Sequence, residues 1–216
     1  MEKGITVTVT AFNRTDLLEI TIDTFLQFNI YPVERIIVTD DSGIIGVNDH
    51  LKKKYKLINI EFVYNSKRIG QIRTIDNMYR TVNTEYIFHL EEDWKFLKSG
   101  FMEKSIETLE SDPMLLQVQI RGQDDMYGIP IVPGNDLYDY VSKGFRGVWH
   151  GFSLNPGLRR LEDYELVKPY AQWGGEPQIS IRYNDLGYTT AILKDKYIQH
   201  IGEGRHTNGA GEAYND

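Results

Sequence analysis

The first 120 residues alternate between short apolar runs and amphipathic segments, and this order restricts the fold more than any other feature of the chain. Strands are predicted over residues 5–9, 35–40, 58–64, 86–90 and 115–120. Helices are predicted between them, over residues 15–26, within 44–55, over 69–82 and over 99–112. Asn13 or Thr15 is expected to cap the first of these helices, and Ser99 the last. This order predicts an α/β fold, in which helices cover a mostly parallel sheet.

The second half of the chain is less regular. Closely spaced glycines and prolines between residues 121 and 157 predict loops and short antiparallel strands. Helices are predicted over 158–166 and 176–186, followed by two short strands over 189–193 and 196–200. Because no segment resembles a linker, the whole chain, 1–216, is predicted to be a single domain with a regular half, 1–120, and an irregular half, 121–216.

The composition excludes several classes of protein. A chain of 216 residues can bury a full core, and without cysteine it has no disulfide, thiolate nucleophile or zinc–thiolate site. Its net charge of −7 argues against a nucleic-acid partner. No run reaches the roughly 18–20 apolar residues of a transmembrane segment, and no signal peptide is visible. We therefore expect a soluble, cytoplasmic protein.

Polar side chains follow each of the first four predicted strands. They lie at residues 10–14, 40–43, 65–68 and 91–93. In open parallel sheets, ligands bind beyond the carboxyl ends of the strands. Several such groups at one edge indicate a polar ligand there.

Glu91, Glu92 and Asp93 are the most informative of these groups. Three consecutive acids repel one another unless a cation or an arginine lies among them. In an extended chain Glu91 and Asp93 share a side, so both are expected to face one site. Their hard oxygen ligands suit Mg²⁺ or Mn²⁺. The alternative is a solvated acidic turn.

Four further candidates have equally simple structural explanations. Asp40 and Asp41 precede Ser-Gly, which is common turn chemistry and is the favoured interpretation when taken alone, although one carboxylate could instead bind a nucleobase or ribose. Arg68 and Arg73 flank the start of a predicted helix. Arg73 is expected to pair with Asp76 at the surface, unless one of the two arginines binds a diphosphate.

Two candidates lie in the second half. Glu176 precedes a predicted helix, either as an acid stabilised by the helix dipole or as a general base. His200 ends the last predicted strand, either as a structural residue or as a metal ligand. The usual glycine-rich dinucleotide motif, the P-loop and the Gly-x-Ser-x-Gly elbow are all absent from the sequence.

Taken in order, these motifs resemble the GT-A class of nucleotide-sugar-dependent glycosyltransferases, especially the family-2-like enzymes. The likeness rests on residues 9–14, 38–43, 65–70, 89–94, 152–157, 174–177 and 200–202, which together extend over nearly the whole chain. The resemblance implies a GT-A, Rossmann-like sheet flanked by helices. Residues 1–120 would bind the nucleotide sugar, and the smaller half, 121–216, would bind the acceptor.

The resemblance also implies roles for individual residues. The nucleotide-sugar site would consist of Thr10, Phe12, Arg14, Asp40, Asp41, Arg68, Arg73, Glu91 and Glu92. Asp93 would be the direct metal ligand at the family's Asp-x-Asp position, where Glu91 replaces the first aspartate. Glu176 would be the catalytic base, although Pro177 replaces the aspartate of the usual Glu-Asp pair. His200 would be the second metal ligand, with His206 as its alternative.

The implied reaction transfers a sugar from a nucleotide sugar, with UDP favoured, to a hydroxyl of a glycan or other acceptor. It would use Mn²⁺ or Mg²⁺ and invert the anomeric centre, with retention as an alternative because one carboxylate does not fix the stereochemistry. Two rival functions are a noncatalytic nucleotide- or sugar-binding GT-A-like domain and, ranked lower, a sugar-phosphate nucleotidyltransferase. The donor sugar, the acceptor and the oligomeric state are left open.

Overall fold

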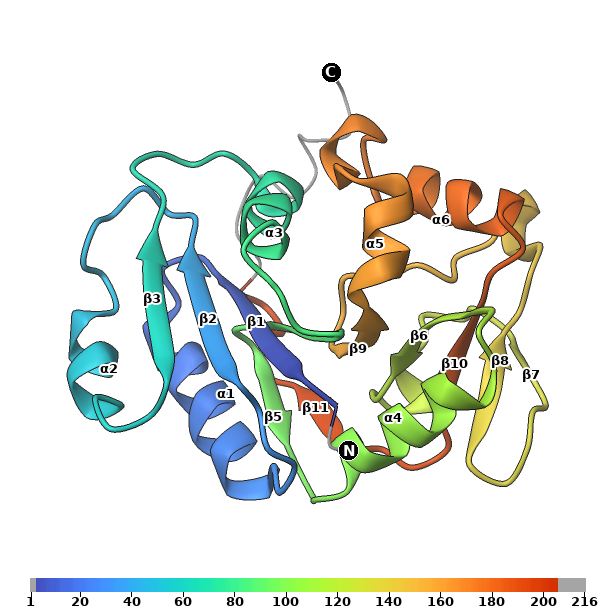
Figure 1. The fold of residues 1–216 in the computed structure, drawn as a ribbon, viewed down its shortest axis with the longest axis horizontal. Helices are drawn as coiled ribbons and strands as arrows, with labels where there is room; N and C mark the ends of the chain where they lie inside the picture. The colour runs from blue at the N-terminus through green and yellow to red at the C-terminus, as the bar shows by residue number, and fades with distance from the viewer. Residues whose placement is uncertain (1–2, 206–216) are drawn as a thin grey trace.

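Figure 1 shows a computed structural model of the chain, which describes residues 3–205. In this part of the chain nine strands form one sheet in the order β3–β2–β1–β4–β9–β6–β10–β8–β7. Their bounds are β1 Ile5–Ala11, β2 Arg35–Asp40, β3 Ile60–Tyr64, β4 Tyr86–Glu91, β6 Leu115–Gln119, β7 Ile131–Val132, β8 Tyr138–Val141, β9 Gly157–Arg160 and β10 Thr189–Leu193. A separate antiparallel pair consists of β5 (Trp94–Phe96) and β11 (Ile198–His200).

Helices cover both faces of the sheet (Figure 1). Their bounds are α1 Thr15–Phe28, α2 Asp49–Lys54, α3 Gln71–Tyr79, α4 Phe101–Ser111, α5 Leu161–Val167 and α6 Glu176–Asp185, with short 3₁₀ turns η1 Gln123–Asp125, η2 Phe145–Gly147 and η3 Tyr170–Gln172. Apolar side chains of α1, α2 and α4 pack in one core cluster, and those of α3, α5 and α6 pack in another. None of the helices between residues 3 and 205 combines the length and apolar character needed to cross a membrane.

The first half has the architecture that its periodicity predicts. β1 lies between β2 and β4, and all pairings among β1, β2, β3 and β4 are parallel. Alternate residues of β2 enter opposite cores, with Ile36 in the cluster of α1 and Ile37 in that of α3, as the two-residue period of a strand requires. The α/β prediction is confirmed, and the carboxyl ends of these strands meet at one edge of the sheet.

Two strands were not predicted from the sequence. Residues 157–160, predicted as the start of a helix over 158–166, form β9, and α5 begins only at Leu161. β9 lies antiparallel between β4 and β6, where all four of its residues are buried. Arg160 donates hydrogen bonds to the carbonyls of Leu109 and Leu115. These partners are distant in sequence, so local periodicity does not reveal the strand. β5 depends in the same way on its pairing with β11.

The predicted helix caps were also wrong. α1 begins after Arg14 and α4 after Gly100, and neither of these residues forms a side-chain capping bond. At α4 the position requires a φ of +92°, in the left-handed region that glycine adopts without strain, so Gly100 rather than Ser99 precedes the helix.

Asp76 on α3 connects the two halves of the chain. This buried carboxylate accepts hydrogen bonds from the Tyr164 hydroxyl at 2.8 Å, the Tyr170 backbone N–H at 2.8 Å and the Ala171 backbone N–H at 2.9 Å. The surface pairing of Asp76 with Arg73 that the sequence suggested is therefore wrong. Asp76 instead fixes α5 and η3 against α3.

We expect Asp76→Ala to lower the free energy of unfolding by about 3 kcal/mol, because it leaves three buried donors without their acceptor. Urea unfolding followed by circular dichroism measures the change. Asp136→Ala removes an exposed carboxylate and is the matched control. Equal stability of the two variants would contradict the bridging role of Asp76.

Candidate functional site

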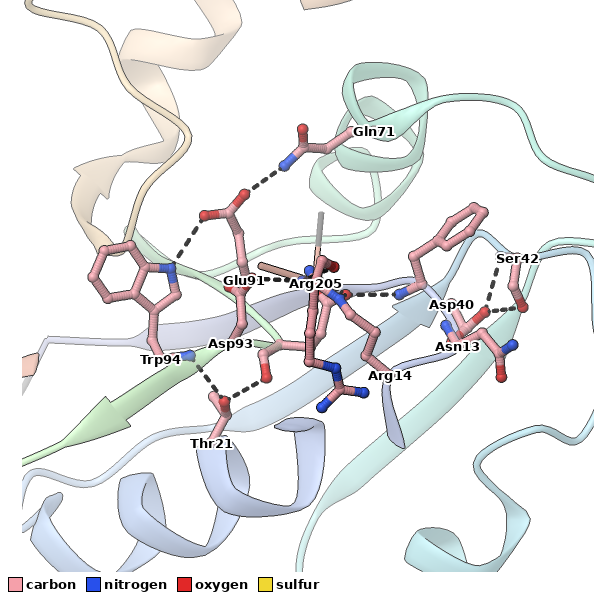
Figure 2. A network of polar contacts seen from close by, with 12 residues as sticks. Asn13, Arg14, Thr21, Asp40, Ser42, Gln71, Glu91, Asp93, Trp94 and Arg205 are labelled. Carbon is pink, nitrogen blue, oxygen red and sulfur yellow. Dashed lines mark hydrogen bonds and ion pairs between the residues drawn. The ribbon is translucent and has the colours of Figure 1, made fainter. Parts of the chain in front are cut away.

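The carboxyl ends of β1, β2 and β4 bring together most of the polar residues singled out from the sequence (Figure 2). Phe12, Asn13 and Arg14 follow β1, and Asp40 ends β2. Glu91 ends β4, and residues 92–93 form a turn into β5. The parallel register places Thr10 beside both Thr39 and Glu91, so these loops are neighbours.

Arg14 lies between two of the three consecutive acids. Its Nε and Nη2 atoms each lie 2.7 Å from Glu92 Oε1, and its Nη1 lies 2.9 Å from Asp93 Oδ2. The backbone N–H of Phe12 donates to the same Glu92 oxygen at 3.1 Å. Burial raises the pKa of Glu92, while Arg14 acts in the opposite direction. The positive charge that the acidic run requires is therefore supplied by the chain itself.

Glu91 has a different environment from its two neighbours. Its carboxylate accepts hydrogen bonds from Gln71 Nε2 at 2.7 Å and from Trp94 Nε1 at 3.2 Å, as Figure 2 shows. Burial, together with the charges of Asp93 and Glu92, raises the pKa of Glu91 to about 8. Glu91 and Asp93 have different hydrogen-bond partners, because the extended chain ends at Glu91 and the alternation of side chains is lost in the turn. The charge of Asp93 nevertheless acts on Glu91, so the expectation that both face one site stays a prediction.

Thr21 on α1 fixes the backbone of this acidic turn. Its hydroxyl donates to the carbonyl of Glu92 at 2.7 Å and accepts from the backbone N–H of Trp94 at 3.2 Å (Figure 2). The turn is therefore held from α1 through Thr21 and from the β1 loop through Arg14.

Asp93 and His200 together offer two ligands to a cation. His200 Nε2 lies 3.3 Å from Asp93 Oδ2, and the N–H of Ile201 donates to the carbonyl of Asp93 at 2.9 Å. An oxygen and an imidazole nitrogen at this separation fit Mn²⁺ or Mg²⁺, provided that phosphate oxygens and water fill the other positions. Between residues 3 and 205 no group of three acidic, histidine or cysteine side chains could hold a metal. His206 lies outside the described residues.

Asp40 and Asp41 are buried and bind loop backbone. Asp40 accepts hydrogen bonds from the backbone N–H groups of Asn13 at 3.0 Å and Ser42 at 2.9 Å. Asp41 accepts from the backbone N–H groups of Ile69 at 2.9 Å and Gly70 at 2.8 Å. Through these bonds, β2 determines the positions of the loops after β1 and β3.

The remaining residues predicted for nucleotide binding differ in exposure. Arg68 is exposed, and its guanidinium carbon lies 5.0 Å from the centre of the Phe12 ring. Arg73 is exposed on α3. The Thr10 hydroxyl is buried and has no hydrogen-bond partner within the described chain. Of Arg68 and Arg73, it is therefore Arg68 that contacts the loop after β1.

Glu176 is the first residue of α6, in the second half of the chain. Its Oε1 accepts a short hydrogen bond from the backbone N–H of Leu154. Burial raises the pKa of Glu176, although the Leu154 N–H and the charges of Arg121 and Arg159 act in the opposite direction. Its negative charge in turn raises the pKa of Glu91. Glu176 therefore belongs to the same electrostatic environment as the acidic turn.

Sequence reasoning missed Gln71 and Arg121. Gln71, the first residue of α3, binds Glu91 directly. Arg121 is 3% exposed and interacts electrostatically with Glu91 and Glu176. A signal for Arg121 was present in the sequence, since it directly follows the strand predicted over 115–120, at a strand end like the other candidates.

We expect Arg14→Met to lower the free energy of unfolding by about 3–5 kcal/mol, because it leaves buried acidic groups without their counter-charge. Adding Glu92→Gln to this variant should recover part of the loss, since it removes one of the stranded charges. Chemical unfolding of the single and double variants measures both effects.

Arg205→Met is the control for the Arg14 variant. Arg205 pairs with Asp16 at the surface, with Nη1 and Oδ2 2.6 Å apart. Solvent screens such a pair, so its loss should leave the unfolding midpoint unchanged. If Arg14→Met were equally neutral, Arg14 would not compensate the acidic turn.

The family described as Glycosyl transferase family 2 matches residues 6–145. No curated protein sequence matches the chain. Solved structures with a similar fold include the mannosyltransferase PcManGT from Pyrobaculum calidifontis in complex with GDP-Man and Mn²⁺. Its TM-score is 0.74 at 15% sequence identity, and the alignment covers 95% of this chain and 59% of that one.

Two further structures are similar in fold. GalNAc-T7 with UDP, GalNAc and Mn²⁺ has a TM-score of 0.68 and 14% identity, with 92% of this chain and 44% of that one covered. S. aureus TarS has a TM-score of 0.64 and 13% identity, with 92% and 36% covered. The chain thus spans less than two thirds of the length of these proteins, and at such identities the likeness shows the fold.

Proposed function

The chain belongs to glycosyl transferase family 2, and we propose that it moves a sugar from a nucleotide-sugar donor to an acceptor hydroxyl with the help of a divalent cation. The resemblance drawn from the ordered motifs is confirmed for the family and for the GT-A fold. Membership supports glycosyl transfer in general. The donor, the cation and the roles of individual residues form the proposal.

One observation carries this proposal. Glu176 at the start of α6 is held by the N–H of Leu154, which precedes β9, and β9 pairs with β4, the strand that ends in the acidic turn. The negative charge of Glu176 accordingly contributes to the raised pKa of Glu91. The turn offers ligands for a cation, through which a diphosphate would bind, and Glu176 offers a half-buried carboxylate with a raised pKa. A transferase requires both kinds of group in one site, one for the leaving group and one for the nucleophile.

We assign the nucleotide-sugar site to the predicted set of residues: Thr10, Phe12, Arg14, Asp40, Asp41, Arg68, Arg73, Glu91 and Glu92. Asp40 and Asp41 would act by holding the loops around the nucleotide, because their carboxylates already bind backbone N–H groups. UDP remains the favoured nucleotide. The structures with similar folds include complexes with GDP-Man and with UDP, so GDP belongs in any test.

Asp93 and His200 would hold the cation. When bound, Mn²⁺ or Mg²⁺ would neutralise charge on the diphosphate leaving group. Arg14 shares the Asp93 oxygen that faces His200, so its Nη1 would move away from that oxygen or remain beside the phosphates. Arg14 would otherwise keep its contact with Glu92 and so keep the turn in place.

Glu176 would accept the proton of the acceptor hydroxyl. The hydroxyl oxygen then forms a bond to the anomeric carbon, the bond from that carbon to the diphosphate oxygen breaks, and its electron pair leaves with the nucleoside diphosphate. Attack from the face opposite the leaving group inverts the anomeric centre. Burial of Glu176 makes it a stronger proton acceptor than a surface glutamate, while Leu154 fixes its orientation.

A noncatalytic nucleotide-binding domain is the second candidate. It is favoured by the ion pairs of Arg14, which satisfy Glu92 and Asp93 without a cation. In that case the nucleotide would bind equally well with and without metal, and no donor would be hydrolysed.

We expect UDP or GDP to bind at least ten-fold more tightly in Mn²⁺ than in chelator, and Asp93→Asn to remove most of this difference. Isothermal titration measures both effects, with Asp136→Asn as the exposed control. Binding that is independent of metal, without donor hydrolysis, would support the noncatalytic candidate instead.

We expect Glu176→Gln to lower transfer or donor hydrolysis by about 10²-fold or more while nucleotide binding persists. Because burial raises the pKa of Glu176, wild-type activity should fall as the pH drops through a value above that of an ordinary glutamate. Nucleotide release across a pH series measures both. Exposed Glu162→Gln is the control, and near-wild-type transfer by Glu176→Gln would disprove the base assignment.

A further inference from the structure

The register of β9 places Arg121 opposite Glu91 across one strand. Gly157, the first residue of β9, pairs with His89 of β4 on one side and with Gln119 of β6 on the other. β9 is antiparallel to both, so β4 and β6 run in the same direction and end at the same edge. Glu91 and Arg121 each lie two residues beyond these partners. They therefore flank the chain that enters β9.

That entering chain carries the contact to Glu176. The backbone N–H of Leu154, three residues before Gly157, donates to Glu176 Oε1. Glu176 is thereby anchored over the interval between the ends of β4 and β6. Strand pairing and one hydrogen bond thus place Arg121 and Glu176 at the same edge of the sheet, where the chain enters β9.

Arg121 is a charged residue that is almost completely buried and only partly hydrogen-bonded. It is 3% exposed, its Nε donates to Gln119 Oε1 at 3.1 Å, and its Nη1 is buried with no hydrogen-bond partner within residues 3–205. Its guanidinium carbon lies 5.8 Å from the centre of the Tyr127 ring. A buried cation costs stability unless nearby negative charge compensates it. The electrostatic partners of Arg121 are Asp125, Glu176 and Glu91, together with Tyr127.

We propose that Arg121 is a positioning residue for sugar transfer, and that its buried positive charge keeps the carboxylate of Glu176 ionised so that it can accept a proton from the acceptor. This inference rests on the proposed role of Glu176 as the base. It adds a residue that follows β6 to a site otherwise formed by the β1, β2 and β4 ends, β11 and α6.

The groups that face Glu176 come from several elements. Burial raises its pKa, while the Leu154 N–H, the charges of Arg121 and Arg159 and the Ser153 hydroxyl lower it. Glu91, on the β4 side, is the acid that interacts with it. Burial also lowers the pKa of Arg121, and the nearby acids oppose this effect. The interaction between Arg121 and Glu176 thus favours the charged form of both.

Arg159, like Arg121, has a guanidinium nitrogen that is buried without a hydrogen-bond partner within residues 3–205, but its remaining contacts differ. It is 1% exposed, its Nη2 donates to the Ser153 carbonyl at 3.0 Å, and its guanidinium carbon lies 5.4 Å from the centre of the Phe152 ring. These contacts lie within β9 and the segment that precedes it, so Arg159 supports the local fold. Arg121 is therefore the better residue with which to test the effect of charge on Glu176.

The direct test is a carboxyl titration of the full chain labelled with ¹³C-glutamate, followed by NMR, with the Glu176 resonance assigned from Glu176→Gln. Arg121→Met and Arg121→Gln remove the charge, and Arg121→Lys retains it. We expect both neutral variants to move the Glu176 titration midpoint up by about half a pH unit or more. The lysine variant should stay close to wild type. An unchanged midpoint in either folded neutral variant would overturn the inference.

Two further measurements separate a structural effect from the proposed one. Thermal unfolding identifies which variants remain folded, and a loss of activity at all pH values without a shift of the acid limb would count against the proposal. With any donor that the chain hydrolyses, the acid limb of kcat/KM should move up in Arg121→Met, as the NMR midpoint does. If Glu176→Gln is fully active, the base assignment fails, yet the NMR titration still decides whether Arg121 controls the charge of Glu176.

Discussion

The contact of Arg14 with Glu92 and Asp93 is the interaction on which the site depends. Three consecutive acids at the end of a buried strand would repel one another, and two of them lie below a tenth of their full exposure. The guanidinium joins both carboxylates to the loop after β1, and Thr21 fixes the backbone of the same turn. The path from β4 into β5 is thereby defined, and β5 in turn pairs with β11, which carries His200. The contacts that compensate the acidic run therefore connect the loop after β1 with β11, although these segments lie near opposite ends of the described chain.

The acidic residues of the site fall into three environments, and the differences between them explain their separate roles. Glu92 and Asp93 are neutralised by Arg14, while Asp40 and Asp41 are bound by backbone N–H groups and organise loops. Glu91 and Glu176 form no ion pair within residues 3–205, although the charges of Arg121 and Arg159 act on Glu176, and burial raises the pKa of both. A carboxyl group without a directly bound counter-charge can respond to a proton more readily than one that is already ion-paired.

The first half of the fold was predictable because its information is local. The residues of α1, β2 and α3 that face the two cores recur with helical or strand periods, so both the elements and the sheet edge that carries the candidate site follow from the sequence. β9 and β5 were not predictable, because each is a strand only through partners far along the chain. The same reason explains the site. Residues that directly follow the first four predicted strands were found. Arg121 directly follows the fifth predicted strand, but it was missed because only the position of β9 between β4 and β6 places the end of that strand at the same edge.

The antiparallel direction of β9 is what brings Glu176 to the edge of the sheet that carries the acidic turn. A parallel strand at this place would enter from the opposite edge, and the segment before it would lie far from the carboxyl ends of β1, β2 and β4. Because β9 runs the other way, residues 153–156 lie at the edge of the candidate site, and the N–H of Leu154 can hold Glu176 there. Asp76 then secures α3 to α5 and η3, which precede α6. The orientation of a single strand therefore determines that a carboxylate from the second half of the chain lies at the same edge of the sheet as the acidic turn of the first.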